Sequence, residues 1–210
     1  MAAEAGVSTD AAFGVGSAKI RAFSHEAEFG VARILLLYQG VYGQTRKICE
    51  RLQSELTALG DSAEVLPLAG DGADPAGYDA VVIGASIRNG KHNPAVLEFV
   101  RRYRERLESK PSAFFSVNLV ARKPAKNTPE TNPYVKAFVA RSPWKPALLG
   151  VFGGNLDYQR YRWSDRHIIR FIMTLTGGPT DLATNVEYTD WDEVRRFAAQ
   201  ISVRASGRPT

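Results

Sequence analysis

A short loop with two glycines and a threonine is the part of the sequence best suited to bind an anion. It lies in RILLLYQGVYGQTRKI, residues 33–48, where an apolar run stops at Tyr38. Gly40 and Gly43 follow, and a helix-like pattern begins near Thr45. A helix N-terminus presents unpaired amides and the positive end of its dipole to a phosphate, and glycines let the backbone approach it. The loop predicts a phosphate site, with an ordinary strand-to-helix turn as the alternative.

Other signs of chemistry are few. The loop is not a dinucleotide-binding fingerprint, since no third glycine completes G-x-G-x-x-G, and it is not a P-loop, since Gly-Lys-Ser/Thr is absent. The one cysteine, Cys49, lies in a helix-like apolar pattern that is typical of a small core residue, and it allows no intrachain disulfide. No side chain stands out as an indispensable acid or base, and we expect no metal site.

The elements that must position this loop are short apolar runs alternating with longer amphipathic segments. Strands are predicted at 34–38, 62–68, 79–85, 112–118 and 147–154, and helices at 44–59, 94–109, 130–141 and 190–204. Strands that are apolar on both faces and alternate with helices indicate a parallel sheet covered on both sides. The predicted fold is therefore α/β, with an open doubly wound sheet of five parallel strands. Such sheets bind ligands at the carboxyl ends of their strands, where the first loop lies.

One domain is predicted over residues 33–210, after an extension of different composition over residues 1–32. The extension is rich in Ala, Gly and Ser, and no strand or helix pattern is sustained there. Its basic residues would suit a targeting peptide, but its four acidic residues favour a disordered extension. No run of about 18 consecutive apolar residues exists, so we expect no membrane-spanning helix.

The net charge of +5 and the pI near 9.4 favour an anionic partner. Phosphate, nucleic acid, an acidic small molecule and an anionic membrane face all meet that description, so the charge alone does not choose among them. The single cysteine makes a reducing compartment the simpler expectation.

Longer segments carry a resemblance to a known family. The order of strand, loop, GQT and helix resembles the phosphate loop of flavodoxins, which bind flavin mononucleotide (FMN). More specific matches are DAVVIGASIRNGKH (79–92), PSAFFSVNLVARKP (111–124), TPETNPY (128–134), YQRYRWSDRHIIRFIMTLTGG (158–178) and YTDW (188–191). Together they resemble the flavodoxin-like, quinone-dependent (menaquinone-type) protoporphyrinogen oxidases of haem synthesis, over residues 33 to about 204. The resemblance implies an enzyme that oxidises protoporphyrinogen IX to protoporphyrin IX through bound FMN and passes the electrons to a membrane quinone.

The resemblance also assigns cofactor-binding residues to three loops. The first loop contributes Gln39, Gly40, Val41, Tyr42, Gly43, Gln44 and Thr45. The loops after the third and fourth strands are expected to flank the flavin ring. Their residues are Ala85, Ser86, Ile87, Arg88, Asn89, Gly90, Ser116, Val117, Asn118 and Leu119. Flavodoxin-type loops usually carry Ser or Thr in place of Gly40 and Tyr42, and a lost neutral hydrogen bond is worth roughly 1 kcal/mol. A weaker flavin affinity is therefore expected. An exposed His92 ranks low as a proton relay.

The implied substrate has a broad apolar macrocycle and two propionates. Several basic side chains of the second and third loops are placed to meet carboxylates: Arg88, Lys91, Arg122, Lys123 and Lys126. Arg88 and Arg122 are the residues predicted to bind the substrate, since arginine offers a carboxylate two parallel hydrogen bonds. The alternative is a solvated surface.

A long-chain-type insertion is predicted over about 155–185, before a continuation of the fifth strand at 185–188. Its helix, from Asp165 to Leu175, has an apolar face and a basic face, with Ser164 predicted to cap it and Gly177 to end it. A basic amphipathic helix beside aromatic residues suits an anionic membrane, where a lipid quinone would be met. Peripheral membrane contact is therefore expected through residues 158–176. The alternatives are packing on the protein's own sheet and burial in a homo-oligomer. A final prediction is that Thr189 and Asp192 form a capping box at the last helix.

Two other functions stay open from the sequence. One is a quinone reductase or electron-transfer flavoprotein of the same fold, although such carriers are typically acidic and do not need the 122–178 region. The other is a non-catalytic scaffold whose altered loop no longer holds flavin. No nucleic-acid partner is expected, because no recognised nucleic-acid motif is present. The expected location is the inner face of a bacterial cytoplasmic membrane, or a mitochondrial inner membrane if the source is eukaryotic, or otherwise the cytoplasm.

Overall fold

A computed structural model describes residue 1 and residues 30–69 and 73–207. Most of the predicted extension (residues 1–32) therefore lies outside the described residues, from residue 2 to residue 29. Within the described ranges, none of the helices combines the length and hydropathy needed to cross a membrane.

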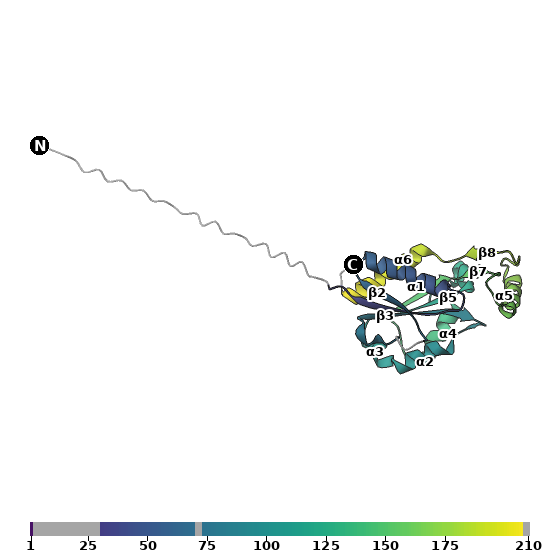
Figure 1. Cartoon of the computed structure of the whole chain (residues 1–210), viewed down its shortest axis with the longest axis horizontal. Coiled ribbons are helices and arrows are strands. Elements are labelled where there is room, and N and C mark those ends of the chain that lie inside the picture. The colour runs from purple at the N-terminus through teal and green to yellow at the C-terminus, as the bar shows by residue number, and fades with distance from the viewer. Residues whose placement is uncertain (2–29, 70–72, 208–210) are drawn as a thin grey trace.

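A parallel sheet in the order β2-β1-β3-β5-β6 forms the middle layer (Figure 1). The order reverses between β1 and β3, so the prediction of a five-stranded doubly wound sheet is confirmed. A short sixth strand, β4, pairs antiparallel with the end of β3. The strands are β1 (Arg33–Gln39), β2 (Ser62–Pro67), β3 (Ala80–Arg88), β4 (Lys91–His92), β5 (Ser112–Asn118) and β6 (Leu148–Gly153).

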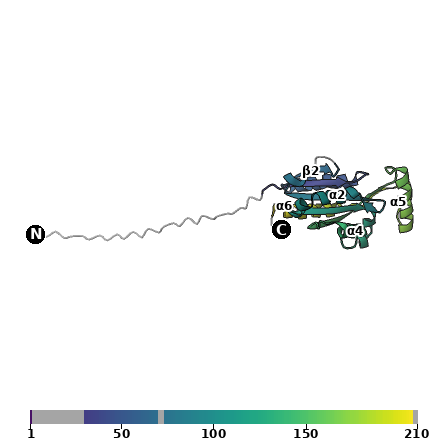
Figure 2. The same ribbon diagram turned by 90° about the horizontal axis from the view of Figure 1, so that it is seen from below.

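Helices cover both faces of this sheet (Figures 1 and 2). On one face lie α1 (Gln44–Ala58) and α6 (Trp191–Ser206). The other face is covered by α2 (Pro94–Arg102), α3 (Arg104–Glu108) and α4 (Pro133–Arg141). Three short 3₁₀ helices complete this part of the chain: η1 (Pro75–Gly77), η2 (Leu119–Arg122) and η3 (Pro124–Lys126).

The first strand shows why apolar runs form the centre of this sheet. Successive side chains of a strand point to opposite faces. Ile34 and Leu36 lie in the core under α1 and α6, whereas Leu35 and Leu37 lie in the core on the opposite face. All four are fully buried, so the strand has no solvated face and its sequence shows no polar alternation.

The insertion extends beyond the carboxyl ends of the strands (Figures 1 and 2). It contains β7 (Asn155–Asp157), α5 (Trp163–Thr176) and β8 (Asn185–Glu187). The prediction that 185–188 continues the fifth strand is wrong, because β8 pairs antiparallel with β7 in a separate two-stranded sheet. The returning chain runs directly against the outgoing one, and the Tyr188 amide donates to the Gly154 carbonyl.

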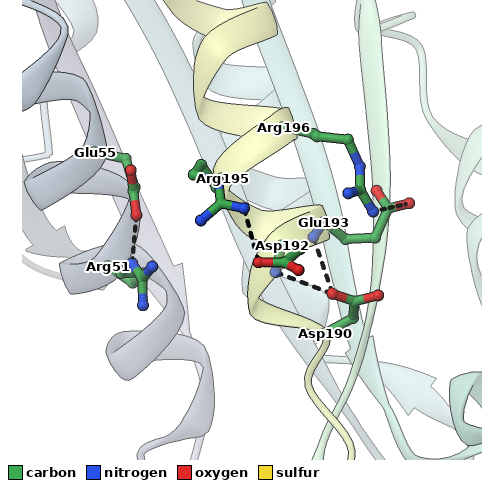
Figure 3. A network of polar contacts seen from close by, with 7 residues as sticks. All are labelled: Arg51, Glu55, Asp190, Asp192, Glu193, Arg195 and Arg196. Atoms are coloured by element: carbon green, nitrogen blue, oxygen red, sulfur yellow. Dashed lines mark hydrogen bonds and ion pairs between the residues drawn. The ribbon is translucent and has the colours of Figure 1, made fainter.

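Two further corrections concern helix boundaries. The predicted helix 94–109 is two helices, α2 and α3, interrupted at Tyr103. The capping box at Thr189 is wrong: Asp190 caps α6 and accepts hydrogen bonds from the amides of Asp192 and Glu193 (Figure 3). Thr189 instead donates to the Gly153 carbonyl, at 2.7 Å.

The insertion helix differs from its prediction at one end only. The structure puts the start of α5 at Trp163, so Ser164 lies inside its first turn and does not cap it. Gly177 ends α5 in the left-handed conformation, with φ 67°, as predicted.

Candidate functional site

The loop between β1 and α1 leaves the helix N-terminus open. Gly43 stands at the N-cap with φ 89°, a conformation that favours glycine. Among the described residues, no side chain caps α1, and its first turn has no acidic residue. The first amides of an α-helix have no acceptor within the helix, so those of α1 are available to an anion.

Thr45 and Gly40 make the same loop fit a phosphate more closely. Thr45 is 1% exposed, and its Oγ1 has no hydrogen-bond partner in the part of the chain that the structure describes. An unsatisfied buried hydroxyl costs about 1–3 kcal/mol, which a ligand oxygen would recover. A Cβ on Gly40 would lie 2.7 Å from Thr45 Oγ1. Gly40 therefore lets the backbone lie against the Thr45 side chain, where an added Cβ would crowd the hydroxyl.

A cavity of about 470 Å³ lies between the first loop, the ends of β3 and β5, and α5. Eleven of the predicted cofactor residues line it: Tyr42, Gln44, Thr45, Ser86, Ile87, Arg88, Asn89, Gly90, Val117, Asn118 and Leu119. The other predicted residues do not line it: Gln39, Gly40, Val41, Gly43, Ala85 and Ser116. Ala85 and Ser116 are opposite each other in the sheet and fully buried, which leaves only their backbone for a ligand.

The second loop is a tight turn that also contributes to the cavity. β3 continues to Arg88, past its predicted end at residue 85, and turns back into β4. Asn89 and Gly90 form the turn with φ 50° and 75°, the positive values that an Asn-Gly hairpin favours. The turn presents Arg88 at the cavity wall.

The third loop is held by buried amide side chains. Asn118 accepts a hydrogen bond from the Ala121 amide and a second from the Asn132 side chain, and it donates to Ser116. Ser116 Oγ also contacts His92 Nε2, at 3.0 Å. The sequence predicted an exposed His92, but its ring is half-buried against Phe114. Burial lowers the pKa of His92 to about 4. It is therefore neutral at pH 7 and supports the loop from outside the cavity.

Helix α5 forms the cavity wall that sequence reasoning missed. Its inward side chains are Ile168, Ile169, Ile172, Met173 and Thr176. The apolar face of the helix was visible in the sequence, but its spacing does not say what that face covers. The structure places one side of it over the three loops.

The two arginines predicted to bind substrate each contact an end of α5. Arg88 Nε and Nη2 donate to the Asp165 carboxylate at 3.0 and 3.2 Å. Arg122 Nη2 donates to Thr176 Oγ1 at 2.7 Å, and its Nη1 donates to the Leu119 carbonyl. Both guanidinium groups therefore also fasten the insertion to the loops, and substrate binding by either stays a prediction.

One carboxylate joins the insertion to the first loop. The Tyr42 hydroxyl donates to Asp165 Oδ2, which also accepts from Arg88. Burial, together with the hydrogen bond to Asp165, raises the pKa of Tyr42. Burial alone would raise the pKa of Asp165, but the hydrogen bonds from Tyr42 and Arg88 outweigh it and hold that pKa below its usual range. At neutral pH the tyrosine is a donor and the aspartate an ionised acceptor.

Comparisons with known proteins find relatives with a flavodoxin domain and the same fold. A family model described as a flavodoxin domain matches residues 35–183. The protoporphyrinogen IX dehydrogenase (quinone) of Escherichia coli strain K12 is 47% identical over 179 residues, which cover 85% of this chain and 98% of that protein. The protein of the same name from Leishmania major is 42% identical over 174 residues, or 81% of this chain and 74% of that protein. A short-chain flavodoxin structure shares the fold, with a TM-score of 0.50 and 14% identity, covering 84% of this chain and 100% of its own.

Proposed function

Because this chain belongs to the flavodoxin domain family, and within it to the protoporphyrinogen IX dehydrogenases (quinone), we propose that it oxidises protoporphyrinogen IX to protoporphyrin IX. FMN is the cofactor and a membrane quinone is the electron acceptor. The observation that carries the proposal is the buried Thr45 hydroxyl, which lacks a partner in the described chain. It lies in the first turn of α1, whose N-terminus has no side-chain cap, and it lines the cavity. That arrangement suits the phosphate of FMN.

The chain's own residues would bind and orient the cofactor. Thr45 and the first amides of α1 hold the phosphate, and the backbone of 86–90 and 117–119 flanks the ring. Gln44 contributes its amide only, because its side chain donates to Glu187 and Thr189. FMN, when bound, supplies the hydride acceptor of the reaction. The complete oxidation removes three hydrides and three protons from the macrocycle, and three quinones become hydroquinones.

The cavity also offers partners for the substrate's propionates. Lys123 and Lys126 line it, and their ammonium groups contact no acceptor in the described ranges. Arg88 keeps Nη1 free of described protein acceptors, while its other donors bind Asp165. We infer that the carboxylates meet Lys123, Lys126 and this remaining donor, and that the isoleucines of α5 cover the apolar ring and exclude water.

The outer side of α5 supports contact with a membrane. Trp163, Phe171 and Leu175 are 76%, 64% and 70% exposed. Arg166 and Arg170 lie on the same helix, so an anionic lipid surface would meet both apolar and basic side chains. A lipid quinone at that surface would need to pass only α5 to reach the cavity. The proposed location is therefore peripheral, on the inner face of a bacterial cytoplasmic membrane or on a mitochondrial inner membrane.

A titration of the purified protein, stripped of ligand, with FMN tests the cofactor first. Flavin fluorescence should be quenched with saturable one-to-one stoichiometry. Thr45→Val keeps the shape and removes the hydroxyl, so it should weaken binding about tenfold or more, as expected for a hydrogen bond to a charged group. Thr57→Val is the matched control, because its hydroxyl donates to the Gln53 carbonyl of the same helix. A folded sample that does not bind FMN would overturn the proposal.

An anaerobic assay of protoporphyrinogen with a soluble quinone then tests the reaction. Porphyrin fluorescence should rise while the quinone is reduced. A protein that binds FMN and reduces quinones from another donor, yet leaves protoporphyrinogen unchanged, would instead be the quinone reductase of the same fold. Sedimentation with anionic vesicles tests the membrane contact, with Phe171→Ser expected to weaken it. A face buried in a homo-oligomer would instead give a larger species without lipid.

A further inference from the structure

Asp165 is buried at the start of a helix that otherwise lies at the edge of the molecule. It is 4% exposed, whereas several neighbouring side chains of α5 are open to solvent. Its two carboxylate oxygens accept three hydrogen bonds, one from the Tyr42 hydroxyl and two from Arg88. One carboxylate therefore joins the phosphate loop, the ring-flanking loop and the insertion.

Tyr42 belongs structurally to the insertion as much as to its own loop. Its ring packs edge-on against Tyr161, with 4.8 Å between the ring centroids. Tyr161 is itself buried and donates to the Asn155 carbonyl at 2.8 Å. Together with Leu156, Tyr158 and Met173, it forms a small separate core under α5, and Tyr42 packs against that core. A movement of α5 would therefore also move the loop that carries Gly43 and Thr45.

At the opposite end of α5, no ionised acceptor is found among the described residues. There Arg122 binds the hydroxyl and the carbonyl of Thr176. The Asp165 contact is thus the charged attachment of the helix, with the bidentate geometry that makes arginine–carboxylate pairs directional.

We propose that Asp165 is a positioning residue that couples cofactor binding to the placement of α5 over the cavity. Asp165 holds Tyr42 and Arg88 together. The loop conformation that receives the phosphate therefore stabilises the closed position of α5, in which the helix covers the cavity, and that position in turn stabilises the loop conformation. Coupling of this kind is reciprocal: FMN should stabilise the closed insertion, and the attached insertion should strengthen FMN binding. The inference rests on the proposed function, because it takes FMN as the ligand of the first loop.

Limited proteolysis with trypsin gives a readout that does not depend on activity. The insertion contains Arg160, Arg162, Arg166 and Arg170 as cleavage sites, and mass spectrometry locates the cuts. FMN should slow cleavage of residues 158–176 in the unaltered protein. In Asp165→Asn, the insertion should be cut faster without FMN, and FMN should protect it much less. Asp181→Asn is the matched control, since Asp181 lies in the same insertion and, among the described residues, its carboxylate accepts from the nearby Ala183 amide and does not contact the first loop.

FMN titration of a double-mutant cycle tests the same coupling at the other site. Tyr42→Phe, which removes one hydroxyl, should weaken FMN binding about threefold to tenfold. Asp165→Asn should weaken it at least as much. In the double variant the losses of FMN affinity should be less than additive, because both changes weaken the same Tyr42–Asp165 hydrogen bond. Additive losses, or equal FMN protection of the insertion in Asp165→Asn and in the unaltered protein, would overturn the proposal.

Failure of the proposed function gives a different result. An unaltered chain that does not bind FMN would leave no titration to compare, but trypsin without FMN would still report whether Asp165 holds α5. Equal cleavage rates of the unaltered protein and Asp165→Asn would then count against the positioning role. Tyr42→Phe, the milder change, keeps both tests available if Asp165→Asn does not fold.

Discussion

Helices α1 and α6 lie side by side on one face of the sheet (Figure 1). Their N-termini differ, because the start of α6 is capped by a side chain and the start of α1 is not, within the described chain. Asp190 caps α6, and Asp192 and Glu193 add negative charge to its first turn (Figure 3). The start of α1 has Gly43, with no side-chain cap and no acidic first-turn residue among the described positions.

The difference shows where this fold can accept an anion. A carboxylate already interacts with the dipole and amides of α6, which would repel a phosphate. The start of α1 keeps its amides and adds the buried Thr45 hydroxyl. Two helices of similar amphipathic character therefore differ in their capacity to bind an anion. A few residues at the start of each helix decide this difference.

Closing the open end should have the largest effect. Gly40→Val would put a Cβ 2.7 Å from Thr45 Oγ1 and crowd the hydroxyl that is proposed to bind the phosphate. Overpacking of this kind costs about 1–3 kcal/mol, so FMN affinity should fall by up to about a hundredfold. Gly77→Ala is the control, because its Cβ would meet only Arg33 Nη1, at 3.9 Å. Unchanged FMN affinity in Gly40→Val would show that the open end of α1 is not the binding site.

Mild acid should test the comparison of the two helix starts from outside. It is expected to destabilise the protein through His92, which lies at neither helix start. The pKa of His92 is about 4 in the folded protein, below its usual 6.5. The unfolded chain therefore binds more protons below pH 6.5, and stability falls as the pH is lowered towards 4. The expected loss between pH 7 and pH 5 is about 2 kcal/mol. Urea unfolding at both pH values measures it, and His92→Gln should reduce the difference. An equal pH dependence in His92→Gln would contradict this assignment.

Removing the α6 cap should affect stability but not binding. Asp190→Ala leaves the amides of Asp192 and Glu193 without their acceptor, and loss of such a cap costs about 1 kcal/mol. Thermal unfolding should detect the change, while the FMN titration stays the same. Asp190→Ser can accept the same hydrogen bonds and should recover most of the stability. A loss of FMN affinity in Asp190→Ala would mean that the two helix starts are not independent.

The smallest effect is expected from the ion pairs beside that cap. Arg195 pairs with Asp192 at 2.9 Å, and both side chains are more than half exposed (Figure 3). Exposed pairs are worth about 0–1 kcal/mol and are weakened by salt. Arg195→Ala should therefore change urea unfolding by about 0.5 kcal/mol or less, with less difference still in high salt. A larger, salt-independent loss would point to packing of the Arg195 stem.

The sequence predicted the sheet and the strand-to-helix turn after its first strand correctly, for a local reason. Strand and helix patterns repeat within a few residues, so the run ILLLY and the glycines after it already determine a buried strand and a turn. The same local reasoning was wrong at Thr189 and at 185–188. β8 pairs with β7 of the insertion, and Thr189 donates to the Gly153 carbonyl at the end of β6. The spacing of neighbouring residues does not describe either contact.

The sequence by itself thus determined the fold class, the five strands and a glycine loop suited to phosphate. Only the tertiary structure decided how that loop is completed. Asp165 lies 123 residues from Tyr42 and 77 residues from Arg88 along the chain, yet it contacts both. Arg122 reaches Thr176 across 54 residues. Contacts at such separations depend on where the sheet brings its loops together, and no short-range pattern carries that information.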